Sequence, residues 1–330
     1  MADDDDRARK NEAAESMTAS TSTTRTSAVQ IHTVAFVGIG NMGWPMAANL
    51  IKAGFDVRVV DAVPGRAASF AAQIGGVACT QASDAALGAD ALVTMLPSSK
   101  PVAEVMAQVA SLLTVGSVVI EMSSGLPGFT QSIASELASR GIGLIDCPVS
   151  GGVARARTGE LAIMAGGDKD LILRAGPLLR AMGTSMYHCG GVGAGQAMKA
   201  LNNLVSAGGF LIGVEALLIG SKFGLDPELM VDVLNSSTGM NNSTQKKFKQ
   251  FVLSRTFDSG FSLDLMVKDL SIALEIGQET ETPTPFAGLC VDLWRSAAAL
   301  LGPGQDHTAM AQFAERLGSA LLEIPGEADC

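Results

Sequence analysis

Apolar residues recur along the chain with two different periods. In the first half, short apolar runs alternate with segments of helical spacing. The runs predict strands at residues 34–37, 57–60, 91–96, 117–121, 143–146 and 160–164, and helices between them include 44–52, 102–113 and 131–140. Strands that alternate with helices are typical of a mostly parallel sheet with helices on both faces. The first half therefore predicts an α/β, doubly wound domain.

From about Gly193 onward the apolar spacing is helical and strand patterns disappear. Helices are predicted at residues 198–221, 227–234, 262–279, 285–301 and 307–322. The longest apolar stretch, residues 204–220, contains Glu215 and several glycines, which favours a buried helix over a membrane span. We therefore predict an all-α C-terminal domain at residues 194–330, after an α/β domain at residues 31–193.

The first thirty residues differ from the rest, because they are polar and low in complexity. MADDDDRARK is followed by TASTSTTRTS, and this composition predicts a disordered leader at residues 1–30. A secretory signal would need a basic start and an apolar run, and Asp3 to Asp6 argue against a mitochondrial presequence. We therefore expect a cytoplasmic protein.

Composition narrows the classes of partner. The net charge is −10, whereas a nucleic-acid-binding protein needs a basic stripe that faces the phosphates, so no nucleic-acid partner and no membrane partner are expected. The five cysteines contain no CxxC pair and are expected to be reduced thiols. The three histidines show no HxxxH spacing, so no metal site is predicted. A small molecule remains as the expected partner.

One motif points to a nucleotide. The strand at residues 34–37 continues into Gly38-Ile39-Gly40-Asn41-Met42-Gly43, and a helix follows. The first glycine permits a tight turn, the second lets the backbone approach a pyrophosphate, and the third lets helix and strand pack closely. The helix N-terminus offers free N–H groups to the phosphates. These six residues predict the cofactor loop of a Rossmann domain.

Asp61 indicates which dinucleotide is bound. It ends the second strand, 18 residues after Gly43. A carboxylate at this place can accept hydrogen bonds from the adenosine ribose and repels a 2′-phosphate, which favours NAD over NADP. Arg66 is a nearby cation that could receive a 2′-phosphate, so NADP is left open.

Two further segments carry candidate chemistry. Lys199 lies near the start of the long apolar helix, and Asn203, four residues later, shares its helix face. A lysine becomes a base near neutral pH when burial lowers its pKa, although most lysines lie on the surface. The segment Ser150-Gly151-Gly152 follows Pro148, and its N–H groups could bind an anion. An ordinary turn is the alternative for that segment.

Four blocks resemble the β-hydroxyacid dehydrogenase family. They are VAFVGIGNMGWPMAANLIKAG, DCPVSGGVARARTGELAIMAGG, GAGQAMKALNN and LMVKDL, and they occur in the order and with the spacing of that family. The resemblance covers roughly residues 33–322. It implies an NAD(P)-dependent dehydrogenase that acts on the CH–OH group of a small 3-hydroxy acid, or reduces the corresponding semialdehyde.

The resemblance also implies roles for individual residues. Lys199 would be the catalytic acid/base, with Asn203 as its partner. The substrate would be bound by Ser123, Ser150, Gly151 and Gly152. The cofactor would contact Leu96, Pro97, Ser124 and Lys268 in addition to the glycine loop and Asp61. For Lys268 an ion pair with Asp264, one helical turn earlier, is the alternative.

Several alternatives stay open at this stage. An NADP-dependent glyoxylate or semialdehyde reductase and an imine reductase share this pattern, although imine reductases usually lack the lysine found at Lys199. 6-Phosphogluconate dehydrogenase has a much longer helical domain. A non-catalytic nucleotide-sensing module would bind NAD without turnover. The resemblance and the Gly208–Gly209 pair predict a homodimer or homotetramer, and residues 236–242 are expected to determine substrate specificity.

Overall fold

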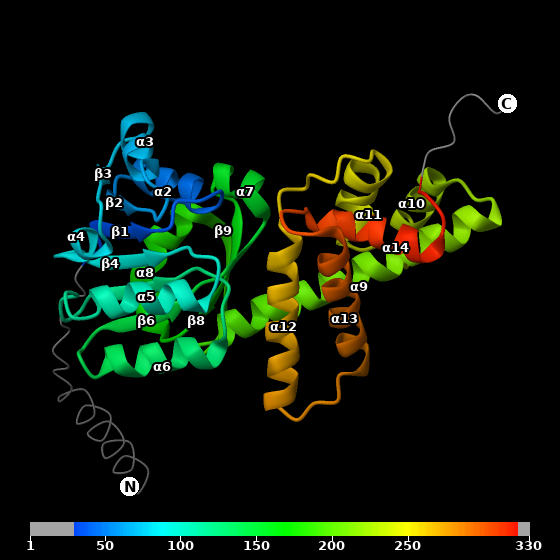
Figure 1. Cartoon of the computed structure of the whole chain (residues 1–330). Coiled ribbons are helices and arrows are strands. Elements are labelled where there is room, and N and C mark those ends of the chain that lie inside the picture. The colour runs from blue at the N-terminus through cyan, green and yellow to red at the C-terminus, as the bar shows by residue number, and fades with distance from the viewer. Residues whose placement is uncertain (1–29, 323–330) are drawn as a thin grey trace, which may run out of the picture. The chain divides into compact units, whose positions relative to one another are not determined.

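The computed structural model of the chain describes residues 30–322, and Figure 1 shows its elements. The predicted leader lies outside the described residues except for Gln30. The strands are β1 (Thr33–Val37), β2 (Asp56–Val60), β3 (Val77–Ala78), β4 (Ala91–Thr94), β5 (Val118–Glu121), β6 (Gly143–Asp146), β7 (Val149–Ser150), β8 (Leu161–Gly166) and β9 (Gly183–Gly190). The helices between them are α2 (Gly43–Lys52), α3 (Arg66–Gln73), α4 (Ala82–Ala86), α5 (Ser99–Val109), α6 (Pro127–Ala138), α7 (Gly152–Thr158) and α8 (Lys169–Met182).

The strands form one sheet in the order β3-β2-β1-β4-β5-β6-β8-β7, with β9 paired to β8. Strands β1 to β6 pair with one another in parallel, whereas β8 runs antiparallel to β6 and β7. The order reverses between β1 and β4, so the carboxyl ends of these two strands flank a crevice where ligands bind in doubly wound folds.

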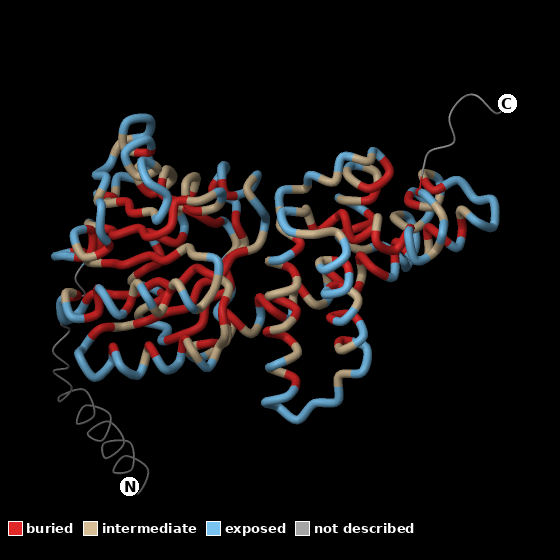
Figure 2. The backbone as a smooth tube through the Cα atoms, in the orientation of Figure 1, coloured by how far each residue is buried: buried red, intermediate tan, exposed pale blue. Residues whose placement is uncertain are grey.

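Alternation along β1 explains why this strand is apolar from Val34 to Val37. Val34 and Phe36 belong to the core on one face of the sheet, and Ala35 and Val37 belong to the core on the other. Side chains on a strand point alternately to opposite faces, so a sheet that helices cover on both sides needs continuous apolar strands. Figure 2 shows these strands as buried.

The helical domain consists of α9 (Ala194–Phe223), α10 (Pro227–Asn235), α11 (Asn242–Lys246), a π-helix η1 (Phe248–Leu253), α12 (Leu263–Glu279), α13 (Pro285–Leu301), a 3₁₀ turn η2 (His307–Ala309) and α14 (Met310–Gly318). The prediction of an N-terminal Rossmann domain followed by an all-helical domain is confirmed. The single helix predicted at 307–322 is instead a 3₁₀ turn followed by a shorter helix, which ends at Gly318 before Ser319 in a left-handed conformation.

Helix α9 is the central helix of the second domain. By length and composition alone it could cross a membrane, but half of its most apolar window is buried inside the chain. Phe210 on this helix packs edge-on against Phe248, whose ring leaves no room for a side chain at Gly213. Its first turns lie against β8, so α9 connects the two domains. The sequence expectation of a buried helix here agrees with this packing.

Strand β9 and helix α11 are absent from the sequence prediction. Strand β9 has neither a continuous apolar run nor a regular alternation, and four of its eight residues are exposed. Helix α11 is one and a half turns long and depends on a capping box formed by Asn241 and Thr244. Short, half-exposed elements carry little hydrophobic periodicity, which is why the pattern does not reveal them.

Candidate active site

The glycine loop between β1 and α2 has the close packing that its sequence predicts. Gly38 adopts φ +95°, and a Cβ at this position would lie 2.4 Å from the carbonyl oxygen of Met95. A Cβ at Gly43 would lie 1.9 Å from the carbonyl oxygen of Gly38. At Gly40, by contrast, a Cβ would meet no other atom within 4 Å, so the backbone is open to a ligand here. No side chain caps the N-terminus of α2. The loop is therefore free to accept an anion at its backbone N–H groups.

Asp61 lies at the carboxyl end of β2 and is tied to this loop. Its Oδ2 accepts a hydrogen bond from the Ile39 N–H at 2.9 Å, and Oδ1 accepts one from the Val63 N–H at 2.8 Å. Arg66, the cation that could receive a 2′-phosphate of NADP, forms an ion pair with Oδ1 of Asp61 at 3.0 Å. The carboxylate thus fixes the glycine loop and holds the guanidinium at the same time.

A cavity of about 830 Å³ opens beside the loop. Its lining includes Ile39, Gly40 and Asn41 of the loop, Arg66 and Arg157, and Gly260 from the helical domain. The open face at Gly40, the uncapped helix and this cavity fit a dinucleotide, so these residues would hold the pyrophosphate and adenosine of NAD or NADP.

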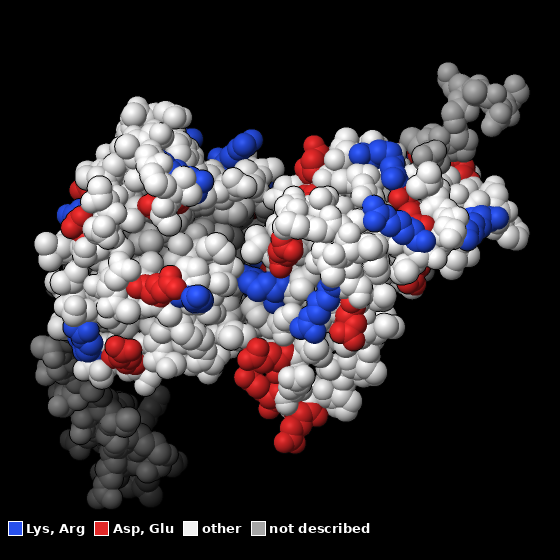
Figure 3. Space-filling model, in the orientation of Figure 1, with Lys and Arg blue, Asp and Glu red and all other residues white. Residues whose placement is uncertain are grey.

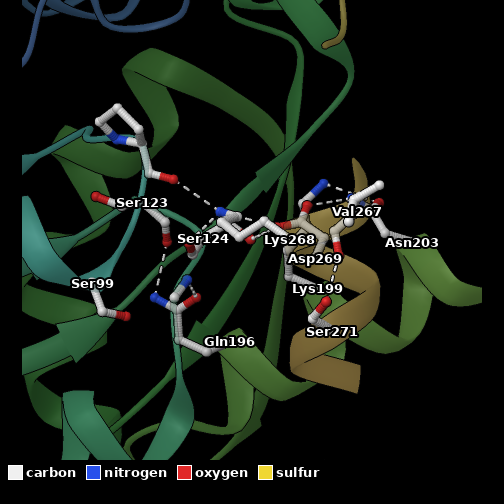
Figure 4. A network of polar contacts seen from close by, with 12 residues as sticks. Ser99, Ser123, Ser124, Gln196, Lys199, Asn203, Val267, Lys268, Asp269 and Ser271 are labelled. Carbon is white, nitrogen blue, oxygen red and sulfur yellow. Dashed lines mark hydrogen bonds and ion pairs between the residues drawn. The ribbon is translucent and has the colours of Figure 1, made fainter. Parts of the chain in front are cut away.

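Lys199 and Asn203 lie one turn apart on α9 and are joined by a hydrogen bond. The Lys199 Nζ donates to the Asn203 Oδ1 at 3.2 Å, and both residues are buried in the described structure. Asn203 in turn donates from Nδ2 to Oδ2 of Asp269, on α12, at 2.6 Å. Figure 4 shows this chain of contacts beside Ser124. The predicted catalytic pair is therefore placed together and connected to a third residue.

Lys268 connects the helical domain to the Rossmann domain. Its Nζ donates to the carbonyl oxygen of Ser124 at 2.5 Å and to that of Pro97 at 3.1 Å. It also forms an ion pair with Asp269 at 3.1 Å, not with Asp264. Asp269 completes the link, because its Oδ1 accepts a hydrogen bond from the Ser124 hydroxyl at 2.8 Å. Three residues expected at the cofactor, Pro97, Ser124 and Lys268, thus meet where the domains touch.

Burial and local charge change the acidity of Lys199. Removal from water disfavours the ammonium form and lowers the pKa of Lys199 below its ordinary value. The positive charge of Lys268 adds to this lowering, whereas the negative charge of Asp269 opposes it. A buried lysine with a lowered pKa has the property that an acid/base group needs near neutral pH.

Two buried carboxylates hold the first turn of α9 in place. Asp146, at the end of β6, accepts hydrogen bonds from the backbone N–H groups of Gly193 (2.7 Å) and Gln196 (2.9 Å). Glu121, at the end of β5, accepts from the side-chain amide of Gln196 and from the Ser123 N–H. Burial raises the pKa of Glu121 to about 7. These contacts fix the start of α9 and therefore the position of Lys199 on this helix.

Ser123 is buried, and its hydroxyl oxygen accepts a hydrogen bond from the Leu96 N–H at 2.9 Å. The Gln196 amide also donates to the Ser123 carbonyl oxygen at 2.9 Å. Both predicted loops, 96–97 and 123–124, are therefore joined to each other and to the start of α9.

The segment Ser150–Gly152 joins the end of β7 to the start of α7. Ser150 belongs to β7, which pairs with Ala162 of β8, and Gly151 and Gly152 have positive φ values of 135° and 67°. Among the described residues, no hydrogen bond joins this segment to Lys199 or Asn203. The expected specificity segment, residues 236–242, is mostly exposed, and its Asn241 side chain serves as the N-cap of α11.

Three of the residues that position the site are not among those predicted from the sequence. Glu121 and Asp146 each end an apolar strand, and an acidic residue at that place is a signal that the carboxyl edge of the sheet carries buried charge. Gln196 lies three residues before Lys199, on the same helix, and only the tertiary structure reveals that it contacts Glu121.

Two family models match the chain over adjacent ranges. The model described as the NAD binding domain of 6-phosphogluconate dehydrogenase matches residues 33–191. The model described as NAD-binding of NADP-dependent 3-hydroxyisobutyrate dehydrogenase matches residues 193–314. Together the two ranges include every residue of the site described above.

Similar proteins are dehydrogenases of hydroxy acids. The chain is 35% identical over 287 residues to 2-(hydroxymethyl)glutarate dehydrogenase of Eubacterium barkeri, which covers 86% of this chain and 95% of that protein. It is 36% identical over 271 residues to NAD-dependent L-serine dehydrogenase of Pseudomonas aeruginosa, covering 79% and 91%. A structure of 3-hydroxyisobutyrate dehydrogenase from Mycobacterium tuberculosis with L-serine matches with a TM-score of 0.80 at 33% identity, covering 86% and 99%.

Proposed function

Because the chain belongs to the 3-hydroxyisobutyrate dehydrogenase-like β-hydroxyacid dehydrogenases, we propose that it oxidises a small 3-hydroxy acid with NAD and that Lys199 is the acid/base. Its class, an NAD(P)-dependent dehydrogenase that acts on hydroxyl groups, follows from the family. One observation supports the finer proposal most strongly: the buried Lys199 ammonium is hydrogen-bonded to Asn203 where Lys268 of the helical domain contacts the Rossmann domain.

In the proposed reaction the alcohol becomes an aldehyde. The residues of the glycine loop would hold NAD, which would supply the two-electron oxidant for the hydride lost when the C–H bond of the alcohol carbon breaks. The O–H bond breaks at the same time, its proton passes to the neutral amine of Lys199, and the C=O double bond forms. Asn203 holds the amine, since its Oδ1 accepts one of the amine hydrogens and leaves the lone pair for the substrate proton. In the reverse direction Lys199 returns the proton.

The substrate carboxylate needs a separate anchor. We assign it to Ser123 and to the N–H groups of Ser150–Gly152, whose two glycines let consecutive N–H groups face one anion. The Lys199 amine then lies close to the hydroxyl rather than to the carboxylate. This arrangement favours a 3-hydroxy acid, in which the reacting hydroxyl is on the carbon next to the one that bears the carboxylate.

For the cofactor we propose that NAD is preferred to NADP. Asp61 lies where the adenosine ribose is expected, and a carboxylate there repels a 2′-phosphate. Arg66 does not offset this repulsion, because its guanidinium is already paired with Asp61.

A substrate screen tests the proposal. NAD or NADP is supplied with 3-hydroxyisobutyrate, L-serine, 2-(hydroxymethyl)glutarate and other 3-hydroxy acids, and the absorbance of the reduced cofactor is followed. The reverse semialdehyde reduction is run in parallel. We expect turnover with NAD and at least one 3-hydroxy acid. Binding of NAD without turnover of any hydroxy acid or semialdehyde would instead identify a nucleotide-sensing module.

A further inference from the structure

Lys247 is a second, half-buried lysine whose surroundings the proposed reaction does not use. It directly follows α11, which packs against α9. Asn241, the N-cap of α11, donates to the carbonyl oxygen of Gly209 at 3.3 Å, and Phe248, the residue after Lys247, fills the space beside Gly213. The backbone of Lys247 is thus fixed on both sides over the part of α9 that follows Asn203.

His307 determines where the Lys247 side chain ends. The Lys247 Nζ lies 2.8 Å from the His307 Nε2, and the His307 Nδ1 lies 3.2 Å from the carbonyl oxygen of Phe261. A carbonyl only accepts hydrogen bonds, so Nδ1 carries the proton and Nε2 accepts from the ammonium. Burial lowers the pKa of His307, which favours this neutral form. The Lys247 ammonium therefore donates a hydrogen bond to Nε2 of the buried His307.

The ring of His307 places this pair on the catalytic face of α9. It packs against Phe210 with ring centroids 6.0 Å apart. Phe210 follows Asn203 by seven residues, two helical turns, so the two residues lie on the same face, as do Lys199 and Asn203. His307 therefore holds Lys247 near the face of α9 that carries Lys199 and Asn203.

The charges around Lys247 leave an excess of positive charge. Asp306 lies behind His307, and its carboxylate is occupied by Ser259, the backbone N–H groups of residues 260, 261 and 308, and the Thr308 hydroxyl. Burial lowers the pKa of Lys247 to about 8; the charge of Lys199 contributes to the lowering, and Asp306 opposes it. The two ammonium groups are therefore within electrostatic reach of each other, and Asp269 is paired with Lys268.

Among the described residues, His307 is the one hydrogen-bond partner of the Lys247 ammonium. An ammonium has three N–H donors, so two remain for a ligand. A second carboxylate would be a suitable ligand, because it would accept both donors and offset the positive charge of Lys247.

We propose that Lys247, held by His307, binds a second carboxylate of the substrate, so that the enzyme acts on 3-hydroxy acids that are dicarboxylates. This inference rests on the proposed function, since it places the reacting hydroxyl at Lys199 and the first carboxylate on the Rossmann side. The second carboxylate lies at the other end of the substrate. His307 is a positioning residue, because it acts through Lys247.

Two substrates with the same reacting group test the inference. 3-Hydroxyisobutyrate carries a methyl group where 2-(hydroxymethyl)glutarate carries a CH₂CH₂COO⁻ group, and the distal monoamide of the latter keeps the size without the charge. We expect the wild-type enzyme to have the highest kcat/KM for the dicarboxylate. Lys247→Met should lower the dicarboxylate-to-3-hydroxyisobutyrate ratio by about 10- to 100-fold, the range for one hydrogen bond to a charged group. Lys247→Arg should restore part of the ratio.

The ratio is independent of the folded fraction, because both substrates are measured on the same enzyme preparation. Lys246→Met, an exposed lysine one position earlier, makes the same change of charge and should leave the ratio unchanged. Three results would overturn the inference while leaving the proposed function intact. They are an equal loss of kcat/KM for both substrates in Lys247→Met, a preference of the wild-type enzyme for the monoamide, and weaker NAD binding in Lys247→Met.

Binding of non-reacting acids separates this inference from the reaction itself. Glutarate and butyrate carry no hydroxyl group, so their affinities for the enzyme–NADH complex, measured by calorimetry, do not depend on catalysis. Tighter binding of glutarate that is lost in Lys247→Met supports the second carboxylate site even if neither alcohol is oxidised. Equal affinities for glutarate in the wild-type enzyme and in Lys247→Met would refute it.

Discussion

Asn203 donates a hydrogen bond from its Nδ2 to Oδ2 of Asp269 over 2.6 Å, and this contact determines the orientation of its amide. A carboxylate accepts only from the NH₂ end, so the Asn203 Oδ1 faces Lys199. The amine therefore donates to Asn203 and keeps its remaining capacity for the substrate. Since α9 carries Asn203 and α12 carries Asp269, the same contact also locks the two helices together.

The neighbours of Lys199 should shift the pH profile of oxidation in opposite directions. Oxidation needs the neutral amine, so the rate should rise with pH to a plateau, with a midpoint at the pKa of Lys199 in the complex with substrate. Asp269 raises this pKa and Lys268 lowers it. Asp269→Asn should therefore move the midpoint to lower pH, and Lys268→Met should move it to higher pH, in steady-state kcat profiles.

Lys169→Met is the control for charge, because Lys169 is exposed on α8 in the Rossmann domain. Its midpoint should equal that of the wild-type enzyme. Shifts of the same sign in Asp269→Asn and Lys268→Met would show that the profile reports a group other than Lys199.

Asp61→Ser should reduce the preference for NAD. The change removes a charge that repels a 2′-phosphate and releases Arg66 from its ion pair. We expect the NAD-to-NADP ratio of kcat/KM to fall by about 10- to 100-fold, the range for one hydrogen bond to a charged group. When Arg66→Ala is added to Asp61→Ser, the NAD-to-NADP ratio should return most of the way to the wild-type value. A wild-type enzyme that prefers NADP would refute the proposed role of Asp61.

Glu121 should make the stability depend on pH. Its pKa is raised from 4.5 to about 7 in the folded chain, so its favourable contribution is fully present below pH 4.5 and is lost as pH rises through 7. Between pH 5 and pH 8 the wild-type protein should therefore lose about 2–3 kcal/mol of stability that the Glu121→Gln variant does not lose. Thermal unfolding of both proteins across this range measures the difference, and parallel curves would argue against a buried, titrating Glu121.

We expect a homodimer or homotetramer, but for a different reason from the one that the sequence indicated. Phe286 and Asn241 of the same chain already pack against Gly208 and Gly209, so this pair does not offer a surface for another helix. Instead, one face of α9 exposes a stripe of apolar side chains: Leu201, Val205, Ile212, Ile219 and Phe223. The stripe is about 33 Å long at the usual helical rise.

Ile219→Glu places a charge in this stripe and should shift the mass measured by light scattering toward the monomer. Leu173→Glu is the matched control, because Leu173 is exposed to a similar degree (70% against 71%) but lies on α8. A wild-type protein that is monomeric at all concentrations would contradict the expectation.

The parts of the site that the sequence predicted are those encoded by neighbouring residues. Gly38, Gly40 and Gly43 lie within six residues, and Lys199 and Asn203 lie one helical turn apart, so local geometry is sufficient. The fold class followed from two hydrophobic periods that differ between the two halves. The resemblance to a known family then added residues such as Lys268, which no local pattern distinguishes from a surface lysine.

Contacts between distant segments could not be predicted. Asn203 and Asp269 are 66 residues apart, and Glu121 and Gln196 are 75 residues apart. Helical spacing makes Asp264 an available partner of Lys268, but the packing of α12 on the Rossmann domain turns Lys268 toward Pro97 and Ser124 instead. The sequence does not distinguish Lys247 from a surface lysine, because its contact with His307, 60 residues later, exists only in the folded chain.

Single-turnover kinetics of Lys199→Ala test most directly whether Lys199 is the acid/base. Lys199→Arg tests whether charge alone is sufficient, since a guanidinium does not release its proton near neutral pH. With NAD affinity measured separately, we predict unchanged NAD binding in both variants and a hydride-transfer rate that is lower by about a hundredfold to ten-thousandfold, the range for a positioned acid/base. Hydride transfer at a near-wild-type rate in Lys199→Ala would contradict the account.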